Sequence, residues 1–125
     1  MIKDQSALSI LEGLIRGSIT ITKMEDFRTV LAEYPDNPFV NRLVADFLKK
    51  DASFSNAIKR YQKTYRLFVA DGETLHAVAA LLELWEIVKP APYELRSLHS
   101  QLRRQDSHNS LLDECFATMS YQELR

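Results

Sequence analysis

Cysteine is nearly absent from this chain, because Cys115 is the single cysteine among 125 residues. One cysteine excludes a disulfide within the chain and any zinc site that needs several thiolates from it. The sequence therefore predicts a fold that holds together without covalent cross-links, in a reducing compartment such as the cytoplasm.

Glycine and proline are also scarce, at three and four residues. Both residue types interrupt regular secondary structure, so the long segments that lack them favour helices. The glycines stand alone at Gly13, Gly17 and Gly72, and no glycine-rich loop is present to cradle a phosphate group. We predict no cofactor.

Neither sign of charge is in clear excess, since the chain has 16 basic and 17 acidic side chains and a formal net charge of -1. Such a balance creates no overall field that would attract DNA, RNA or an anionic membrane. No apolar run reaches the roughly 18 residues of a membrane span, and the N-terminus MIKDQSALS lacks the features of a signal peptide. We therefore expect a cytoplasmic protein without a membrane segment.

The most apolar stretch is residues 75–88, LHAVAALLELWEIV. At about 100° per residue, its polar side chains His76, Glu83 and Glu86 fall on one narrow stripe that also holds Ala79 and Ala80. A helix that is apolar over most of its circumference has to be covered on several sides. We expect this helix to be the core of a single domain of residues 1–119.

Apolar residues recur at helical spacing in other segments as well. The expected helices lie between Asp4 and Gly17 and at residues 22–34, 38–50, 53–72, 92–104 and about 110–119. The helix ends are marked by local signals: Thr22 with Glu25 as a capping box, Pro38 as a first helical residue, and Gly72 as a left-handed cap. We expect Thr74 to cap the core helix, and residues 18–22 to form an extended connector.

Short links between these segments force neighbouring helices to reverse direction. The sequence therefore predicts an all-α array of six or seven antiparallel helices. Ser120 and Glu123 form a second capping box, so residues 120–125 are expected to begin a further helix that leads into a downstream domain.

Candidate groups for chemistry are few. His76, Glu83 and Glu86 share a helix face, but two carboxylates and one histidine on a single helix make a poor zinc site, and a solvated stripe is the ordinary interpretation. Cys115 stands at an apolar position beside Phe116, which is typical of a buried small hydrophobe. We predict no catalytic and no metal-binding residues.

The outer face of the helix at residues 53–71 is basic. Lys59, Lys63 and Arg66 recur at helical spacing with Arg60 beside them, a pattern found where helices contact phosphates. A solvated surface is the ordinary interpretation of such a row. A nucleic-acid-associated helical domain is therefore the alternative function, although the total charge is against it.

Two stretches of the chain echo each other when Pro38 is aligned with Pro92, namely PFVNRLVADFLKKDAS and PYELRSLHSQLRRQDS. The matches include Arg42 with Arg96 and Leu48 with Leu102. Helical hairpins repeated along a chain are typical of a solenoid, in which stacking between units buries the hydrophobic faces. Chance similarity between two amphipathic helices is the competing explanation.

From residue 22 to residue 105 the sequence resembles the tetratricopeptide repeat family, whose period is about 34 residues. One match is carried by Val44, Ala45, Leu48, Phe54, Ala57, Ile58 and Tyr61, with Thr64 where the family prefers alanine. A second is carried by Phe68, Gly72, Ala77, Val78, Leu81 and Leu84 and closes at Pro90. The two matches overlap on the helix at residues 53–71, which leaves the repeat register open.

This resemblance implies an α-solenoid of helical hairpins that acts as a non-catalytic scaffold and binds a protein or peptide in a groove. The first helices of successive units would form that groove. The residues expected to contact the partner are Asn41, Arg42, Asp46, Lys63 and Arg66.

The last residues, LLDECFATMSYQELR, are similar to the segment that leads into bacterial cyclic-nucleotide-binding domains. Phe116, Ser120, Glu123 and Leu124 carry the likeness. It implies a larger bacterial signalling protein with such a domain downstream in the same polypeptide. The β-roll and phosphate cassette of that domain are absent from these 125 residues, so the chain itself is not expected to bind cyclic nucleotides.

Overall fold

The computed structural model describes residues 7–21 and 23–123, with side chains described up to residue 117. Within this part the chain is helical and contains no strand, so the predicted all-α fold is confirmed. Its elements are α1 (Ala7–Arg16), the 3₁₀ helix η2 (Met24–Phe27), α2 (Arg28–Glu33), α3 (Pro38–Lys50), α4 (Phe54–Ala70), α5 (Thr74–Ile87), α6 (Pro92–Gln105) and α7 (Ser110–Glu123).

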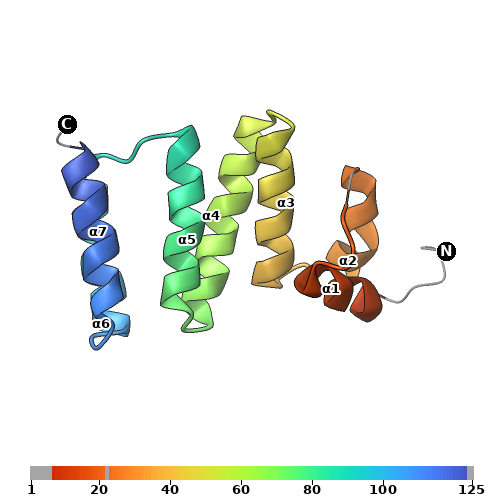
Figure 1. Cartoon of the computed structure of the whole chain (residues 1–125), viewed down its shortest axis with the longest axis horizontal. Coiled ribbons are helices and arrows are strands. Elements are labelled where there is room, and N and C mark those ends of the chain that lie inside the picture. Colours follow the sequence, from red (N-terminus) through yellow and green to blue (C-terminus); the bar gives the residue numbers. More distant parts are fainter. Residues whose placement is uncertain (1–6, 22, 124–125) are drawn as a thin grey trace.

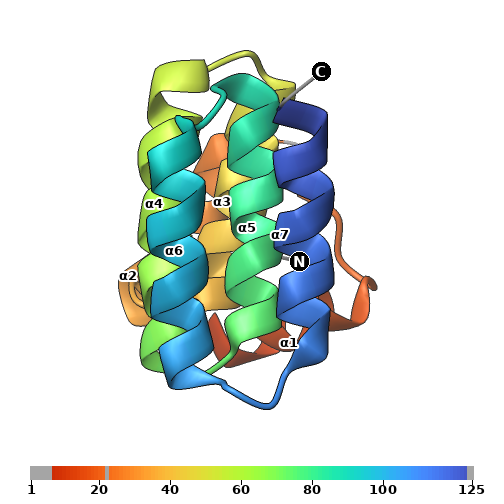
Figure 2. The same cartoon turned by 90° about the vertical axis from the view of Figure 1, so that its left-hand side faces the viewer.

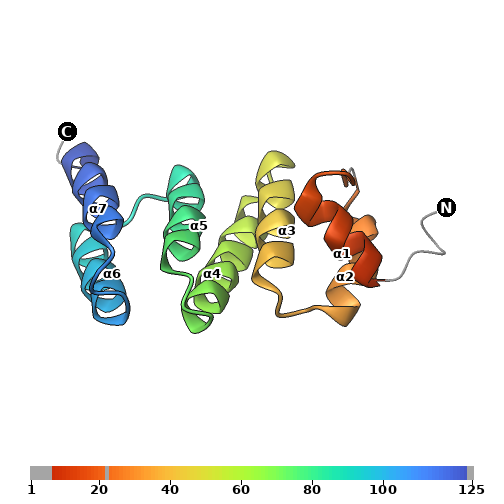
Figure 3. The ribbon, with the colours of Figure 1, turned by 60° about the horizontal axis from the view of Figure 1, so that its bottom comes forward.

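The helices stand side by side in a row that runs from α1 and α2 to α6 and α7 (Figure 1). Seen along the row, α4 and α6 lie on one side, while α5 and α7 lie on the other (Figure 2). The N-terminal helix α1 packs against α2 at one end (Figure 3). The chain therefore forms two layers of helices that extend along one axis.

Apolar side chains from three successive groups of helices form the core. The clusters are centred on Leu11, Val30 and Val44 for α1 to α3, on Ala57, Tyr61 and Leu81 for α3 to α5, and on Val78, Leu102 and Phe116 for α5 to α7. Leu48 belongs to the first two clusters, and Trp85 to the last two. Neighbouring clusters thus share side chains, and the hydrophobic core is continuous along the row of helices.

Helix α5 packs against α4 over its length and also contacts α7. Ala77 and Ala80 are fully buried, because small side chains let the neighbouring helices approach closely. The prediction of a solvent-facing stripe on α5 is only partly correct. Ala80, which was expected on that stripe, is buried in the core, whereas Leu75 and Leu82 are 38% and 41% exposed. The core helix therefore keeps one apolar edge uncovered.

Helices α3 and α4 end with the same backbone motif. The Ser53 amide donates to the Leu48 carbonyl at 2.9 Å, and the Glu73 amide donates to the Phe68 carbonyl at 2.9 Å. The residue before each donor, Ala52 or Gly72, has a positive φ of 61° or 76°. These contacts satisfy carbonyls at the end of the helix and reverse the chain sharply, which confirms the predicted role of Gly72.

Two predicted helix starts have different outcomes. Pro38 is the first residue of α3 as expected, and the Asn37 side chain accepts a hydrogen bond from the Val40 amide at 3.1 Å. The prediction for Thr74 was wrong, since Glu73 precedes the helix and Thr74 lies inside its first turn. The Thr74 hydroxyl instead donates to Asp106 Oδ2 at 2.8 Å, because a carboxylate is a strong acceptor.

The predicted new helix at Ser120 does not exist, because α7 runs without a break from Ser110 to Glu123. No proline or glycine lies between Ser110 and Ser120, and extending an existing helix costs far less than starting another. The other predicted capping residues, Asp4 and Thr22, lie outside the described residues, as does Leu124. Residues 18–21 have no regular structure, in agreement with the expected connector.

Candidate functional site

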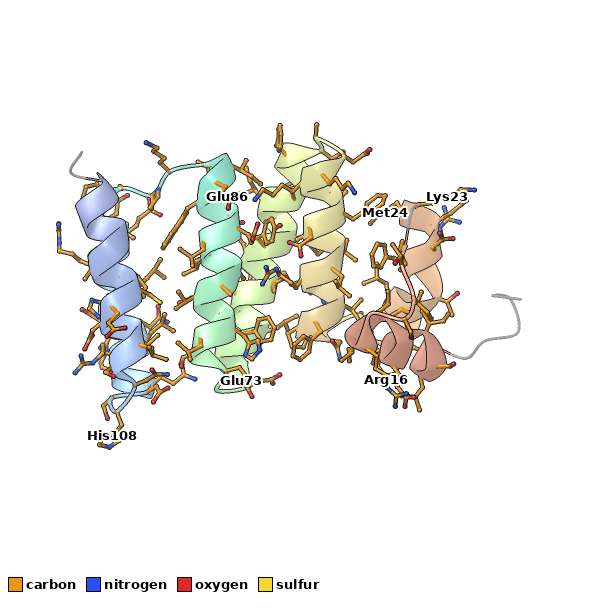
Figure 4. The ribbon with its side chains drawn as sticks, in the orientation of Figure 1. Arg16, Lys23, Met24, Glu73, Glu86 and His108 are labelled. Carbon is orange, nitrogen blue, oxygen red and sulfur yellow. The ribbon has the colours of Figure 1, made fainter. Side chains whose placement is uncertain are left out.

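Helices α3 and α5 lie side by side and run in the same direction. Near their C-terminal ends, Lys49 Nζ is 2.7 Å from Glu83 Oε2 and 2.7 Å from Glu86 Oε1. Near their N-terminal ends, the Phe39 ring lies 5.6 Å from the His76 ring. Figure 4 shows Glu86 at one end of α5 and Glu73 beside the other. Contacts at both ends fix the two helices in register.

Six side chains form a charged cluster between these helices, which we call the α3–α5 network. Its members are Arg42, Asp46 and Lys49 from α3, Tyr61 from α4, and Glu83 and Glu86 from α5. Arg42 Nε is 3.2 Å from Asp46 Oδ1, and Arg42 also lies 3.6 Å from Glu83 Oε1. Two cations therefore meet three carboxylates, with every charge in contact with an opposite one.

Burial and these contacts shift two pKa values in the α3–α5 network. Burial, followed by the hydrogen bond that its hydroxyl donates to Asp46, raises the pKa of Tyr61 far above the usual range. Burial lowers the pKa of Lys49, but hydrogen bonds to Glu83 and Glu86 outweigh it, and the pKa ends above its usual value. The phenol is thus held neutral and the ammonium charged, so neither group is poised to exchange a proton near neutral pH.

A shallow pocket of about 360 Å³ opens over the α3–α5 network, lined by Asp46, Lys49, Lys50, Tyr61 and Glu83. On the same two helices, the apolar side chains Phe39, Leu75 and Leu82 are 41%, 38% and 41% exposed. The Phe39 ring packs edge-on against Phe68 at 5.3 Å, which restricts its orientation. We call the network and these three apolar side chains together the α3–α5 face.

A second, basic surface lies on the other layer. A groove of about 510 Å³, the α4 groove, is lined by Met24, Leu48, Asn56, Lys59, Arg60, Lys63 and Arg66. Lys63 Nζ lies 3.3 Å from Asp36 Oδ1, and Arg60 donates to the neutral Asn41 Oδ1 at 2.8 Å. Within the described residues, Lys59 and Arg66 make no ion pair. The α4 groove therefore holds cationic charge, at Lys59 and Arg66, that no described carboxylate neutralises by an ion pair.

The five residues predicted to contact a partner do not form one site. Arg42 and Asp46 belong to the α3–α5 network, whereas Lys63 and Arg66 line the α4 groove. The prediction for Asn41 was wrong, because this side chain is fully buried. It donates to the carbonyls of Pro35 and Asn37, at 3.0 and 2.8 Å, and accepts from Arg60. Its polar groups hold the loop before α3 and leave nothing for a partner.

The sequence pattern does not indicate Lys49 or Tyr61 as members of a site, and it predicts only a solvated stripe for Glu83. Tyr61 resembled an ordinary core aromatic, and only its hydroxyl reaches Asp46. One signal was present: Lys49 and Glu83 have opposite charges and are 34 residues apart, which is about one tetratricopeptide period.

A third polar cluster joins α6 to α7. His99 Nε2 is 2.7 Å from Asp113 Oδ1, and the His99 ring stacks on Phe116 at 4.8 Å. Arg103 contacts the other carboxylate oxygen of Asp113. Hydrogen bonds from Arg103, and then from His99, lower the pKa of this carboxyl. All three groups are engaged with each other, so this cluster ties two helices together.

Across the described residues, no group of three or more histidine, cysteine, aspartate or glutamate side chains is arranged to hold a metal ion. In the same part of the chain, no helix is both long and apolar enough to cross a bilayer. Comparisons with protein-family models, with curated proteins and with solved structures find no significant match. Function therefore has to be inferred from the geometry of these surfaces.

Proposed function

We propose that this chain is a non-catalytic module that binds partner polypeptides, built as a tetratricopeptide-like array of helical hairpins. The observation that carries the proposal is the even spacing of helices along the chain. Thr74, which begins α5, follows the start of α3 at Pro38 by 36 residues, and Ser110, which begins α7, follows Thr74 by 36. A period of this length is typical of arrays whose helical hairpins stack on one another.

Contacts between successive hairpins support the same register. Lys49 of α3 pairs with Glu83 of α5, and Gln105 at the end of α6 donates to the Val69 carbonyl near the end of α4 at 2.6 Å. Each contact joins residues about one period apart. This register disfavours the alignment of Pro38 with Pro92, which equates α3 with α6 across the two layers. A proline at the first position explains much of that likeness, since both helices begin with one.

In such an array the first helices of successive hairpins present one continuous surface, and here those helices are α3, α5 and α7. The α3–α5 face combines exposed Phe39 and Leu82 with a pocket lined by fixed charges. Aromatic and aliphatic anchors surrounded by polar groups are what a peptide-binding surface requires. Because salt bridges and ring contacts fix the two helices, little order would have to be gained on binding.

The same geometry argues against an enzyme. The charges of the α3–α5 network neutralise one another, and the neutral Tyr61 phenol is not suited to act as a base. A catalytic pair needs a group whose pKa lies near the working pH, beside an accessible nucleophile. Rigid, mutually satisfied charges are better suited to recognition than to turnover.

Selection from a displayed random peptide library tests the proposal. We expect selected peptides to lose at least about tenfold in affinity for the Phe39→Asp/Leu82→Asp variant, because both apolar anchors are replaced by charges. Phe54→Asp/Tyr93→Asp is the matched control, since these side chains are exposed on α4 and α6, outside the α3–α5 face. Failure to select any peptide, or equal losses in both variants, would refute the proposed function.

The second candidate is a nucleic-acid-associated domain, and the unneutralised Lys59 and Arg66 in the α4 groove favour it. Its test is binding to generic duplex and single-stranded DNA at several salt concentrations, since phosphate contacts make affinity fall steeply with salt. Membership of a bacterial signalling protein, a downstream cyclic-nucleotide-binding domain and a cytoplasmic location stay predictions from the sequence. The coding sequence beyond Arg125 tests the first two.

A further inference from the structure

We propose that the α4 groove is a second binding site, specific for a short acidic segment of a partner protein. The groove lies on the layer of α4, away from the α3–α5 face, and none of its lining residues belongs to the α3–α5 network. This inference therefore does not depend on the function proposed for that face.

Charge complementarity identifies the class of ligand. Lys59, Lys63 and Arg66 follow one another at i, i+4 and i+7 and so share one face of α4. Asp36 is the one carboxylate within the described residues that pairs with any of them, and its side chain is 76% exposed. Within the described residues, Lys59 and Arg66 thus form no ion pair, although the chain as a whole carries a net charge of -1. An anionic ligand would supply the missing carboxylates.

The contact between Asp36 and Lys63 shows how such a ligand would bind. A carboxylate at the rim of the groove already lies 3.3 Å from the Lys63 ammonium. Glutamate or aspartate side chains of a bound segment would meet Lys59 and Arg66 in the same way. Arg60 is excluded from this role, because its guanidinium donates to the buried Asn41.

The length of the basic row distinguishes a peptide from a nucleic acid. Seven residues of helix span about 10 Å, a distance covered by roughly three residues of an extended peptide. Proteins that hold nucleic acid by its backbone commonly contact about 6 to 10 phosphates. Three cations in one short row, of which Lys63 already pairs with Asp36, suit a few carboxylates better than a phosphate chain.

The groove is also partly apolar, which favours a peptide over a free anion. Two apolar side chains line the groove: Met24 of η2, which is 37% exposed, and Leu48 of α3. Figure 4 places Met24 on the side of η2 that faces the row of helices. A flexible thioether adapts to different aliphatic side chains, so the preferred segment would carry a leucine or a similar residue between its acidic ones.

Fluorescence anisotropy of a short labelled peptide, with glutamates interrupted by leucines, provides the test. We expect the full chain to bind it at low salt and to bind more weakly as salt screens the charges. The Lys59→Glu/Lys63→Glu/Arg66→Glu variant should bind at least about tenfold more weakly. Circular dichroism confirms that each variant is folded.

The matched control variant is Lys89→Glu/Arg96→Glu/Arg104→Glu, which changes the total charge by the same amount at exposed positions outside the groove. It should bind the acidic peptide nearly as well as the natural chain. Equal weakening in the two variants would overturn the proposal, as would the absence of binding to the natural chain at low salt. Tighter binding of single-stranded DNA, or of phosphatidylserine vesicles, through the same three cations would also overturn it.

Discussion

Asn41 is the buried polar residue on which the loop before α3 depends. Its amide donates to two loop carbonyls and its oxygen accepts from Arg60, so replacement by alanine removes three hydrogen bonds, although the Asn37 carbonyl still accepts from the backbone amide of residue 41. We expect Asn41→Ala to lower the free energy of unfolding by about 2–3 kcal/mol. Urea denaturation measures this. Asn56→Ala, at an exposed position of α4, serves as control, and equal effects of the two substitutions would contradict this role.

Two tyrosines of α4 provide a matched pair. The Tyr61 hydroxyl donates to Asp46, whereas the buried Tyr65 hydroxyl has no hydrogen-bond partner among the described residues. We expect Tyr61→Phe to destabilise the fold by about 1–2 kcal/mol, because Asp46 loses a donor. Tyr65→Phe should be neutral, or stabilising by up to about 1 kcal/mol, since it removes an unpaired polar group. Chemical denaturation measures the free energy of unfolding of both variants. A larger loss of stability in Tyr65→Phe than in Tyr61→Phe would contradict the different environments of the two hydroxyls.

At the scale of helices, the ends of α3 and α4 predict opposite effects of exchanging glycine and alanine. Ala52 and Gly72 occupy equivalent positions with left-handed backbone, a conformation that costs an alanine about 1 kcal/mol relative to glycine. We expect Ala52→Gly to raise the free energy of unfolding by about that amount and Gly72→Ala to lower it similarly. Thermal and urea unfolding measure both. A destabilising Ala52→Gly would show that flexibility gained by the unfolded chain outweighs the relief of strain.

The link between α6 and α7 predicts a dependence on acidic pH. Because the pKa of Asp113 is lowered in the folded chain, its ionised form stabilises the fold at pH values above its usual pKa of 3.8. This stabilisation is lost as the pH falls through the lowered value. We expect Asp113→Asn to lower Tm at neutral pH and to flatten the fall in Tm below about pH 4. Identical acid profiles for the variant and the natural chain would contradict this.

Local signals predicted most of the helices, because the residues that determine a helix end are neighbours in sequence. Pro38 and Gly72 act through their own backbone geometry, so each was correctly assigned. Ser120 has the same kind of local signal, but the helix that precedes it continues because nothing interrupts it. A capping motif therefore predicts a helix start only where the preceding helix has been stopped.

For the molecule as a whole, the surfaces were harder to predict than the helices. The contacts between α3 and α5 in the network join residues 34 to 41 positions apart, so they depend on how α5 packs beside α3. Asn41 was misplaced because polar residues are mostly exposed, and its burial follows from a loop whose path the sequence does not reveal. Arg42 and Asp46 were each expected to contact a partner, whereas their contacts with each other and with α5 and α4 required the structure.

The starts of α3, α5 and α7 are evenly spaced along the chain. In the folded structure Lys49 lies beside Glu83, Phe39 and Leu82 are exposed, and the basic row of α4 lines a separate groove. The chain thus presents two chemically different surfaces. That difference is why we assign them different ligands.

The central claim is that the α3–α5 face binds partner polypeptides. Its most direct test is to follow backbone amide chemical shifts of the isotope-labelled protein during titration with a peptide selected for binding. The account predicts that the largest shifts cluster in residues 39–50 and 75–86. Shifts concentrated in α6 and α7, with these two ranges unchanged, would contradict it.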